Sequence, residues 1–75
     1  MTLEKIFAEV FAIPESSVAD TLELRQISSW DSMSHMFLIT RIEEIFAVQL
    51  TGDEIADMKS VGDARRALQA HAVAV

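Results

Sequence analysis

The stretch DSMSHMFLITRIEEIF, residues 31–46, contains the pattern that decides the fold. Its apolar residues recur at helical spacing and form a wide stripe, while charged side chains occupy the other face. Asp31 precedes the stripe and is a residue type preferred at helix N-caps. The pattern therefore predicts a central helix over residues 32–46, with Leu38, Ile39, Ile42, Ile45 and Phe46 buried and with Arg41, Glu43 and Glu44 facing outward.

Three further helices are predicted on either side of the central one. Thr2 is placed to cap a helix that ends near residue 11 or 12, because Pro14 disfavours helical backbone at the residue before it. A short helix is expected over residues 53–56, and Ser60 is placed to cap a last helix that extends to about His71. Together these helices are expected to bury Leu3, Ile6, Phe7, Val10, Leu50, Ile55, Met58, Val61, Ala64 and Leu68.

Residues 14–30 have no regular periodicity and are predicted to form a long first loop, held to the core by Leu22, Leu24 and Ile27. Structureless connections of this length are uncommon in compact domains and are often functional. No segment alternates polar and apolar residues for long enough to predict a strand. The predicted fold is all-α: a small four-helix bundle of three main helices and one short helix, in a single domain over residues 1–75.

Composition narrows the classes of function. A chain of 75 residues, half of them hydrophobic, forms a core but leaves little room for a deep catalytic cleft. Its net charge of -6 disfavours nucleic acid and favours basic surfaces on partner proteins. The chain has no cysteine, no stretch long enough to span a bilayer and no signal-peptide pattern, so a cytoplasmic location is expected.

Ser32 is the first residue of the predicted central helix. The first backbone N–H groups of a helix lack helical partners, and the helix dipole there favours negative charge. A phosphodiester on the Ser32 hydroxyl would therefore be stabilised at this position. The tripeptide alone is weak evidence, because Asp and Ser are also the residues that commonly cap helices.

Several spaced motifs together make the sequence resemble the acyl carrier protein family, over nearly the whole chain. Asp-Ser-Met at residues 31–33 is followed by an apolar helix that ends in Glu43-Glu44-Ile-Phe46. Leu50 comes four residues after that Phe, and a short acidic segment and the helix start Ser60-Val-Gly-Asp63 follow.

The resemblance implies a non-enzymatic carrier with 4'-phosphopantetheine attached covalently to Ser32, beside Asp31 and Met33. The thiol of this group would hold an acyl intermediate as a thioester. The implied partners are a phosphopantetheinyl transferase, an acyl-loading ligase or synthase, and downstream acyl-transferring enzymes, all meeting a monomeric carrier. Glu43 and Glu44 match the acidic pair that carriers of this family present to basic enzyme surfaces.

The run Trp30-Asp31-Ser32-Met33, followed by His35, resembles stand-alone carriers of specialised pathways, and two positions depart from the family pattern. Members of the family often read Leu-Gly-x-Asp-Ser. This chain has Ser28-Ser29-Trp30 before Asp31, so the glycine is absent and a different approach to the central helix is expected. Phe37 occupies a position that is often acidic in fatty-acid carriers, which makes the start of the helix more apolar.

Other residues near the site carry further expectations. Trp30 is expected to anchor the loop in the core, with a partner contact beside the attachment site as the alternative. His35 is expected to be an exposed side chain on the same helix face as Ser32, with a contact to the arm's phosphate or to a partner as the alternative. Met36, Met58 and Val61 are expected to line a cleft for the arm or its acyl group, and Met36 and Phe37 to contact partners. His71 is expected at the surface, DARRAL (residues 63–68) is expected to be a solvated helix face, and no metal site is expected because nothing places the two histidines together.

Alternative functions remain open at the level of sequence. The chain could carry aminoacyl, peptidyl or D-alanyl groups instead of acyl groups. It could also be an interaction subunit that keeps the fold without the cargo, although the intact Asp31-Ser32-Met33 argues against this. Independent hydrolysis has little support, because His35 alone does not make Ser32 a nucleophile.

Overall fold

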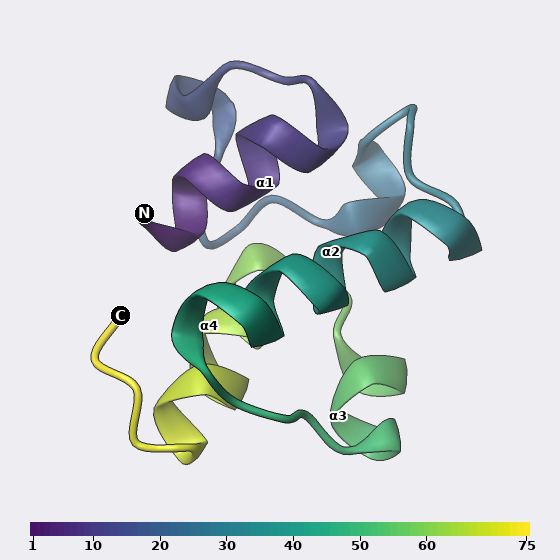
Figure 1. Ribbon diagram of the computed structural model, residues 1–75. Coiled ribbons are helices and arrows are strands. Elements are labelled where there is room, and N and C mark those ends of the chain that lie inside the picture. Colours follow the sequence, from purple (N-terminus) through teal and green to yellow (C-terminus); the bar gives the residue numbers. More distant parts are fainter.

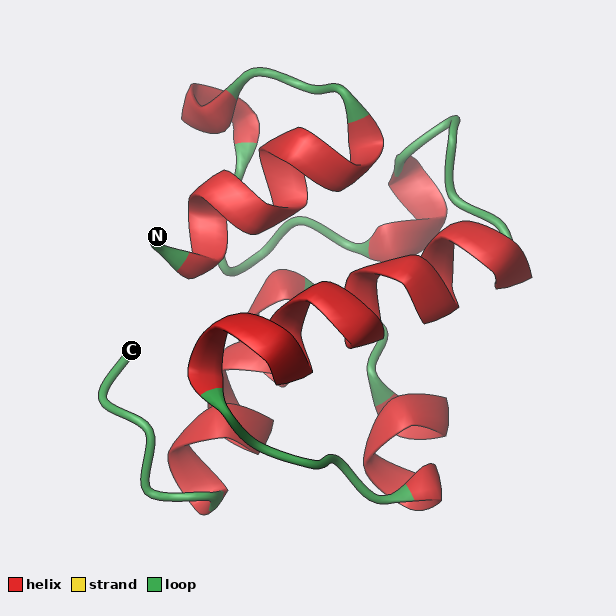
Figure 2. Ribbon diagram, viewed as in Figure 1, coloured by secondary structure: helices red, strands yellow, loops and turns green.

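The computed structural model describes residues 1–75 as a small all-helical molecule, as predicted. In chain order its elements are α1 (Leu3–Phe11), the 3₁₀ helices η1 (Glu15–Ser17) and η2 (Leu24–Gln26), α2 (Ser32–Phe46), α3 (Gly52–Asp57) and α4 (Val61–Ala70). In Figure 1, α2 crosses the middle of the molecule, with α1 on one side of it and α3 and α4 on the other. Figure 2 shows that helices and loops alone build the fold.

Helix α2 has the bounds predicted from the sequence, residues 32–46. Asp31 is its N-cap, and the apolar stripe turns inward so that Leu38, Ile39 and Ile42 are almost completely buried. Ile45 and Phe46 are partly buried against the same core. The central helix therefore follows from local capping and from burial of one apolar face.

The hydrophobic core joins α1, α2, α4 and the first loop, and Ile55 of α3, predicted to be buried, packs against it only partly buried. Helix α1 contributes a buried aromatic pair, Phe7 and Phe11, whose ring centroids lie 6.1 Å apart. Val10, predicted to be buried, is only partly buried. The other buried members are Leu3, Ile6, Val18, Leu24, Ile27, Leu38, Ile39, Ile42, Leu50, Met58, Val61, Ala64 and Leu68.

The first loop is more ordered than the sequence predicted. It contains η1 and η2, and Glu23 and Gln26 form a reciprocal capping box around η2. The same loop pairs with the α3–α4 junction through backbone bonds: Leu24 N donates to Lys59 O at 2.9 Å, and Val61 N donates to Leu22 O at 3.0 Å. These non-local hydrogen bonds, together with the burial of Leu24 and Ile27, hold the loop in place.

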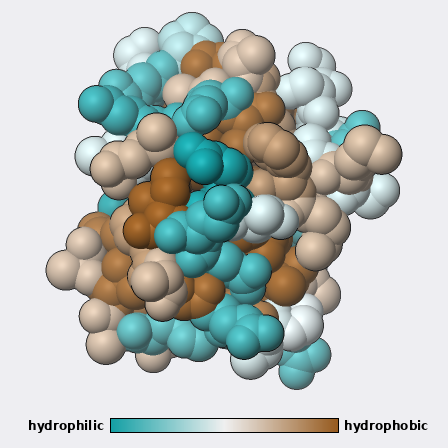
Figure 3. Space-filling model, in the orientation of Figure 1, coloured by the Kyte–Doolittle hydropathy of each residue, from teal (hydrophilic) through white to brown (hydrophobic).

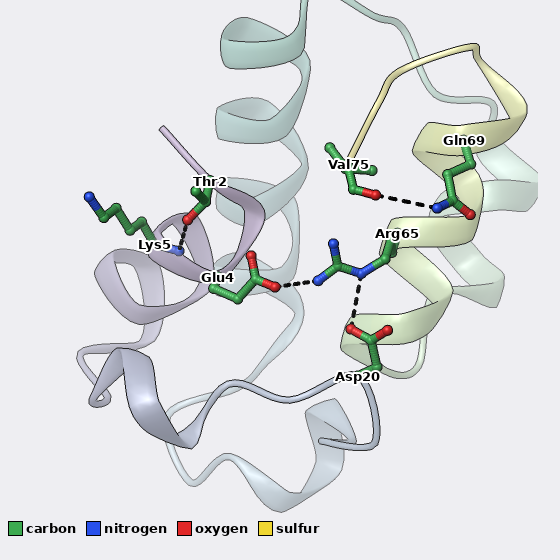
Figure 4. Close-up of polar contacts among 7 residues, drawn as sticks. All are labelled: Thr2, Glu4, Lys5, Asp20, Arg65, Gln69 and Val75. Atoms are coloured by element: carbon green, nitrogen blue, oxygen red, sulfur yellow. Dashed lines mark hydrogen bonds and ion pairs between the residues drawn. The ribbon is translucent and has the colours of Figure 1, made fainter.

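Polar contacts join α4 to α1 and to the first loop (Figure 4). The guanidinium of Arg65 donates to Glu4 of α1 and, through Nε, to Asp20 Oδ1 at 3.0 Å. Both carboxylates raise the pKa of Arg65, and Glu4 contributes most. The expectation of a simple solvated face at residues 63–68 is therefore wrong for Arg65, whose side chain is 20% exposed, but it fits the neighbouring Arg66, which is 70% exposed.

Helix α3 is slightly longer than predicted and is also held by α4. Thr51 caps it in a reciprocal capping box with Glu54, which explains why it begins at Gly52. The Glu54 carboxylate also lies 2.9 Å from Nε2 of His71, just after α4. His71 is thus a half-buried link between α3 and α4 instead of a free surface residue.

Candidate functional site

Ser32 lies exposed at the N-terminus of α2, where capping leaves its hydroxyl free. Asp31 Oδ1 accepts the Ser34 N–H at 2.7 Å, and the Ser34 hydroxyl accepts the Asp31 N–H at 2.8 Å. Ser34 Oγ also lies within hydrogen-bond distance of the carbonyls of Ser29 and Asp31. The Ser32 side chain takes no part in these bonds, so among the hydroxyls of this helix start it is the available one.

The helix dipole favours an anion beside Ser32, and the ionised Asp31 carboxylate next to it partly opposes one. The Ser34 N–H bond lowers the pKa of Asp31, so the capping carboxylate stays ionised at neutral pH. Helix α2 has no acidic residue in its first turn, and the N–H groups of that turn have no helical acceptors. A phosphate on the Ser32 oxygen would meet the positive end of the helix dipole.

The loop that leads into α2 has Ser29 at the position where the family often has glycine. Ser29 Oγ donates to the carbonyl of Phe11 at 3.1 Å, so a side chain ties the end of α1 to the start of α2. Glycine could not make this bond. Ser29 does not have a positive φ, and the backbone here therefore needs no glycine.

A groove of about 780 Å³ opens directly beside Ser32. Its apolar lining includes Trp30, Met36, Ile55 and Met58, and its charged lining comes from Glu23, Arg25, Asp31 and Lys59. The groove thus lies between the start of α2, η2 and α3. Val61 was expected in this lining, and that expectation is wrong: it is 0% exposed, because its side chain packs in the core at the start of α4.

Trp30 and His35 lie together at this groove, contrary to both expectations from the sequence. Trp30 is 38% exposed instead of anchored in the core, and its Nε1 donates to His35 Nδ1 at 3.1 Å. His35 is half-buried, and its Nε2 lies 3.0 Å from the carbonyl oxygen of Ile55 in α3. Both ring nitrogens are therefore engaged, which leaves neither to activate Ser32 as a nucleophile.

The first half of α2 presents an apolar surface. Met33, Met36 and Phe37 are 82%, 50% and 57% exposed. Residues 32–40 contain no Asp, Glu, Lys or Arg. On the face that carries α2, hydrophobic atoms reach the surface among hydrophilic ones (Figure 3).

The two acidic residues near the end of α2, Glu43 and Glu44, have different environments. Glu43 is half-buried, and its Oε2 accepts the Leu50 N–H at 2.8 Å, which fixes the chain that leaves the helix. Glu44 is exposed. The prediction that both side chains face outward is therefore wrong for Glu43, since its carboxylate is turned back to the α2–α3 connection.

The geometry also bears on two other kinds of site. No three His, Cys, Asp or Glu side chains are grouped so that they could hold a metal ion. None of the helices combines the length and apolar character that crossing a membrane requires.

Comparison with known proteins gives two concordant matches. The family model described as "Phosphopantetheine attachment site" matches residues 2–68. The chain is also similar to an acyl carrier protein of Acidothermus cellulolyticus, with 36% identity over 62 residues, which is 83% of this chain and 74% of that protein. The family match includes Ser32, the groove and the whole of α2.

Proposed function

Since this chain belongs to the acyl carrier protein family, we propose that the Ser32 hydroxyl is its attachment point for 4'-phosphopantetheine and that residues 1–75 act as one carrier domain. Proteins of this family are carriers and not catalysts, and phosphopantetheine is the group that they bear. When attached, the group supplies the thiol that a chain without cysteine lacks.

The observation that carries the proposal is the exposed, unbonded Ser32 hydroxyl at the start of α2. The hydroxyl of Ser34, two residues further along α2, is half-buried and occupied by capping bonds. The helix dipole and the first-turn N–H groups favour the phosphate, and the groove beside Ser32 offers an apolar surface to the arm beyond the phosphate. These residues fit the group that the family bears.

The attachment step is a transfer of phosphopantetheine from coenzyme A to the Ser32 oxygen. Ser32 Oγ attacks the phosphorus atom nearer to the pantetheine, and the new P–O bond replaces the bond from that phosphorus to the adenosine bisphosphate, which leaves. The serine proton passes to a base of the transferase, because His35 has both ring nitrogens engaged. Asp31 stabilises the helix start during this step through its bond to the Ser34 N–H.

We infer further that partner enzymes recognise the carrier mainly through the apolar start of α2. Met33, Met36 and Phe37 are large exposed apolar side chains in the first half of α2, and Glu44 adds an exposed negative charge at the far end of the helix. Such a surface suits a loading enzyme and acceptor of a specialised acyl pathway, with an apolar docking site and a basic rim.

Mass spectrometry after incubation with coenzyme A and a broad-specificity phosphopantetheinyl transferase tests the attachment. Wild-type protein is expected to gain one phosphopantetheine, and Ser32→Ala is expected to gain none. Ser28→Ala is the matched control, because it removes an exposed hydroxyl from the same loop and should leave the gain intact. No gain by the wild type, or an equal gain by Ser32→Ala, would overturn the assignment.

A further inference from the structure

The two sides of the groove beside Ser32 are connected through one side chain. Trp30 lies on one side, just before α2, and Ile55 of α3 lies on the other. His35 stands between them: Trp30 Nε1 is 3.1 Å from its Nδ1, and the Ile55 carbonyl oxygen is 3.0 Å from its Nε2. The Trp30 and His35 rings meet edge to face at an interplanar angle of 80°.

The partners of His35 determine which ring nitrogen carries the proton. The indole N–H of tryptophan can only donate, so Nδ1 must accept. A carbonyl oxygen can only accept, so Nε2 must donate. The bridge therefore requires the neutral ring with its hydrogen on Nε2.

We propose that His35 is a positioning residue that holds Trp30 and α3 at a fixed separation, and thereby sets which tethered acyl groups the groove beside Ser32 shelters. The inference rests on the proposed attachment at Ser32. The class of cargo that fits this lining is an apolar acyl chain, because the apolar side chains of Trp30, Met36, Ile55 and Met58 line the groove.

Tryptophan fluorescence tests the bridge without any cofactor. The chain has one Trp and no Tyr, so the emission comes from Trp30 alone. In the wild type at neutral pH, acrylamide quenching of Trp30 is expected to be weak. His35→Gln should be quenched as weakly, because its amide can both accept and donate, and His35→Phe should be strongly quenched. Circular dichroism checks that each variant is folded.

Two results of the fluorescence experiment would overturn the bridge. One is quenching of His35→Phe that equals the wild-type quenching. The other is quenching of His35→Gln as strong as that of His35→Phe, because the amide should keep both hydrogen bonds. If His35→Phe does not fold, the comparison of wild type with His35→Gln still decides.

A second experiment tests the effect on cargo. The transferase is used to load acetyl- and octanoyl-phosphopantetheine from the two acyl coenzymes A, and the cleavage of each thioester by hydroxylamine is followed by mass spectrometry. In the wild type and in His35→Gln, octanoyl is expected to be cleaved several-fold more slowly than acetyl. In His35→Phe this difference should be lost.

The outcomes separate this inference from the attachment itself. Absence of any mass gain on loading overturns the attachment at Ser32, and with it the claim about tethered cargo. Loading that succeeds, with the same octanoyl-to-acetyl ratio in His35→Phe as in the wild type, overturns only the role of His35. Loss of the ratio in both variants would also overturn it, because His35→Gln preserves the two hydrogen bonds.

Discussion

Phe37 is an exposed aromatic side chain on α2 that is suited to contact a partner protein. A large aromatic residue that is 57% exposed leaves more than half of its surface uncovered in the free protein. Aromatic side chains of this kind are frequent anchors at protein interfaces. Its neighbours Met33 and Met36 extend the same apolar surface towards Ser32.

We expect Phe37→Ala to lower kcat/KM for phosphopantetheine transfer by about tenfold, because loss of an interface anchor commonly costs more than 1 kcal/mol. Glu44→Gln should also slow transfer at low salt, since exposed charges mainly steer encounter. High salt should remove the effect of Glu44→Gln and leave that of Phe37→Ala. Transfer rates at two ionic strengths measure both. A Phe37→Ala protein that is modified at the wild-type rate would exclude this residue from the contact.

The residues of the site differ in how far the sequence predicted them. Asp31 and Ser32 were placed correctly at the start of α2, because capping depends on residues a few positions apart. Trp30 and His35 were not, because their arrangement depends on the Ile55 carbonyl, 20 residues further along the chain. No local pattern around His35 indicates that contact.

Helix α3 illustrates an element that depends on charged caps. With bounds Gly52–Asp57, it is too short to be stable alone. The Glu54 carboxylate accepts the Thr51 N–H at 2.8 Å and contacts His71. The Thr51 bond and then the His71 bond lower the pKa of Glu54 from its ordinary value of 4.5.

We expect α3 to loosen as the pH falls below 4.5. A carboxylate whose folded pKa is lowered contributes stability above its unfolded pKa, and this contribution is lost as the pH falls through the lower folded value. Amide hydrogen exchange of α3, corrected for the intrinsic exchange rate, measures the opening. Glu54→Gln should show a smaller pH response, because its amide oxygen accepts the Thr51 N–H at any pH. Equal responses would show that Glu54 does not hold the helix.

The sequence predicted the elements that depend on nearby residues and missed those that depend on distant contacts. The bounds of α2 follow from an N-cap and an apolar stripe, both visible in residues 31–46. The 3₁₀ helices were missed because backbone bonds to the α3–α4 junction support the loop that contains them. Glu23 and Gln26, spaced as a capping box, were the one local signal for η2.

At the scale of the whole molecule, Arg65 joins three segments that are distant in sequence. It bonds Glu4 near the N-terminus and Asp20 in the first loop from its position on α4 (Figure 4). Arg66 carries the same charge but pairs only with Asp63, three residues before it. The two arginines therefore form a matched pair for separating tertiary links from net charge.

We expect Arg65→Gln to lower the free energy of unfolding by about 1 kcal/mol, the upper range for partly exposed ion pairs. Arg66→Gln makes the same change in net charge and should have a much smaller effect, because its side chain is 70% exposed. Urea unfolding followed by far-ultraviolet circular dichroism gives both values. Equal losses would mean that net charge, and not the link between α1, the loop and α4, determines the stability.

The pairing of the first loop with the α3–α4 junction has a consequence for folding order. Leu24 N donates to Lys59 O at 2.9 Å, and both residues line the groove, so segments far apart along the chain build it. Contacts of such high contact order pay a large loop-closure entropy and tend to form late. We therefore expect the complete groove to exist only after the whole chain has folded. A partly folded chain would then lack the binding surface of the carrier.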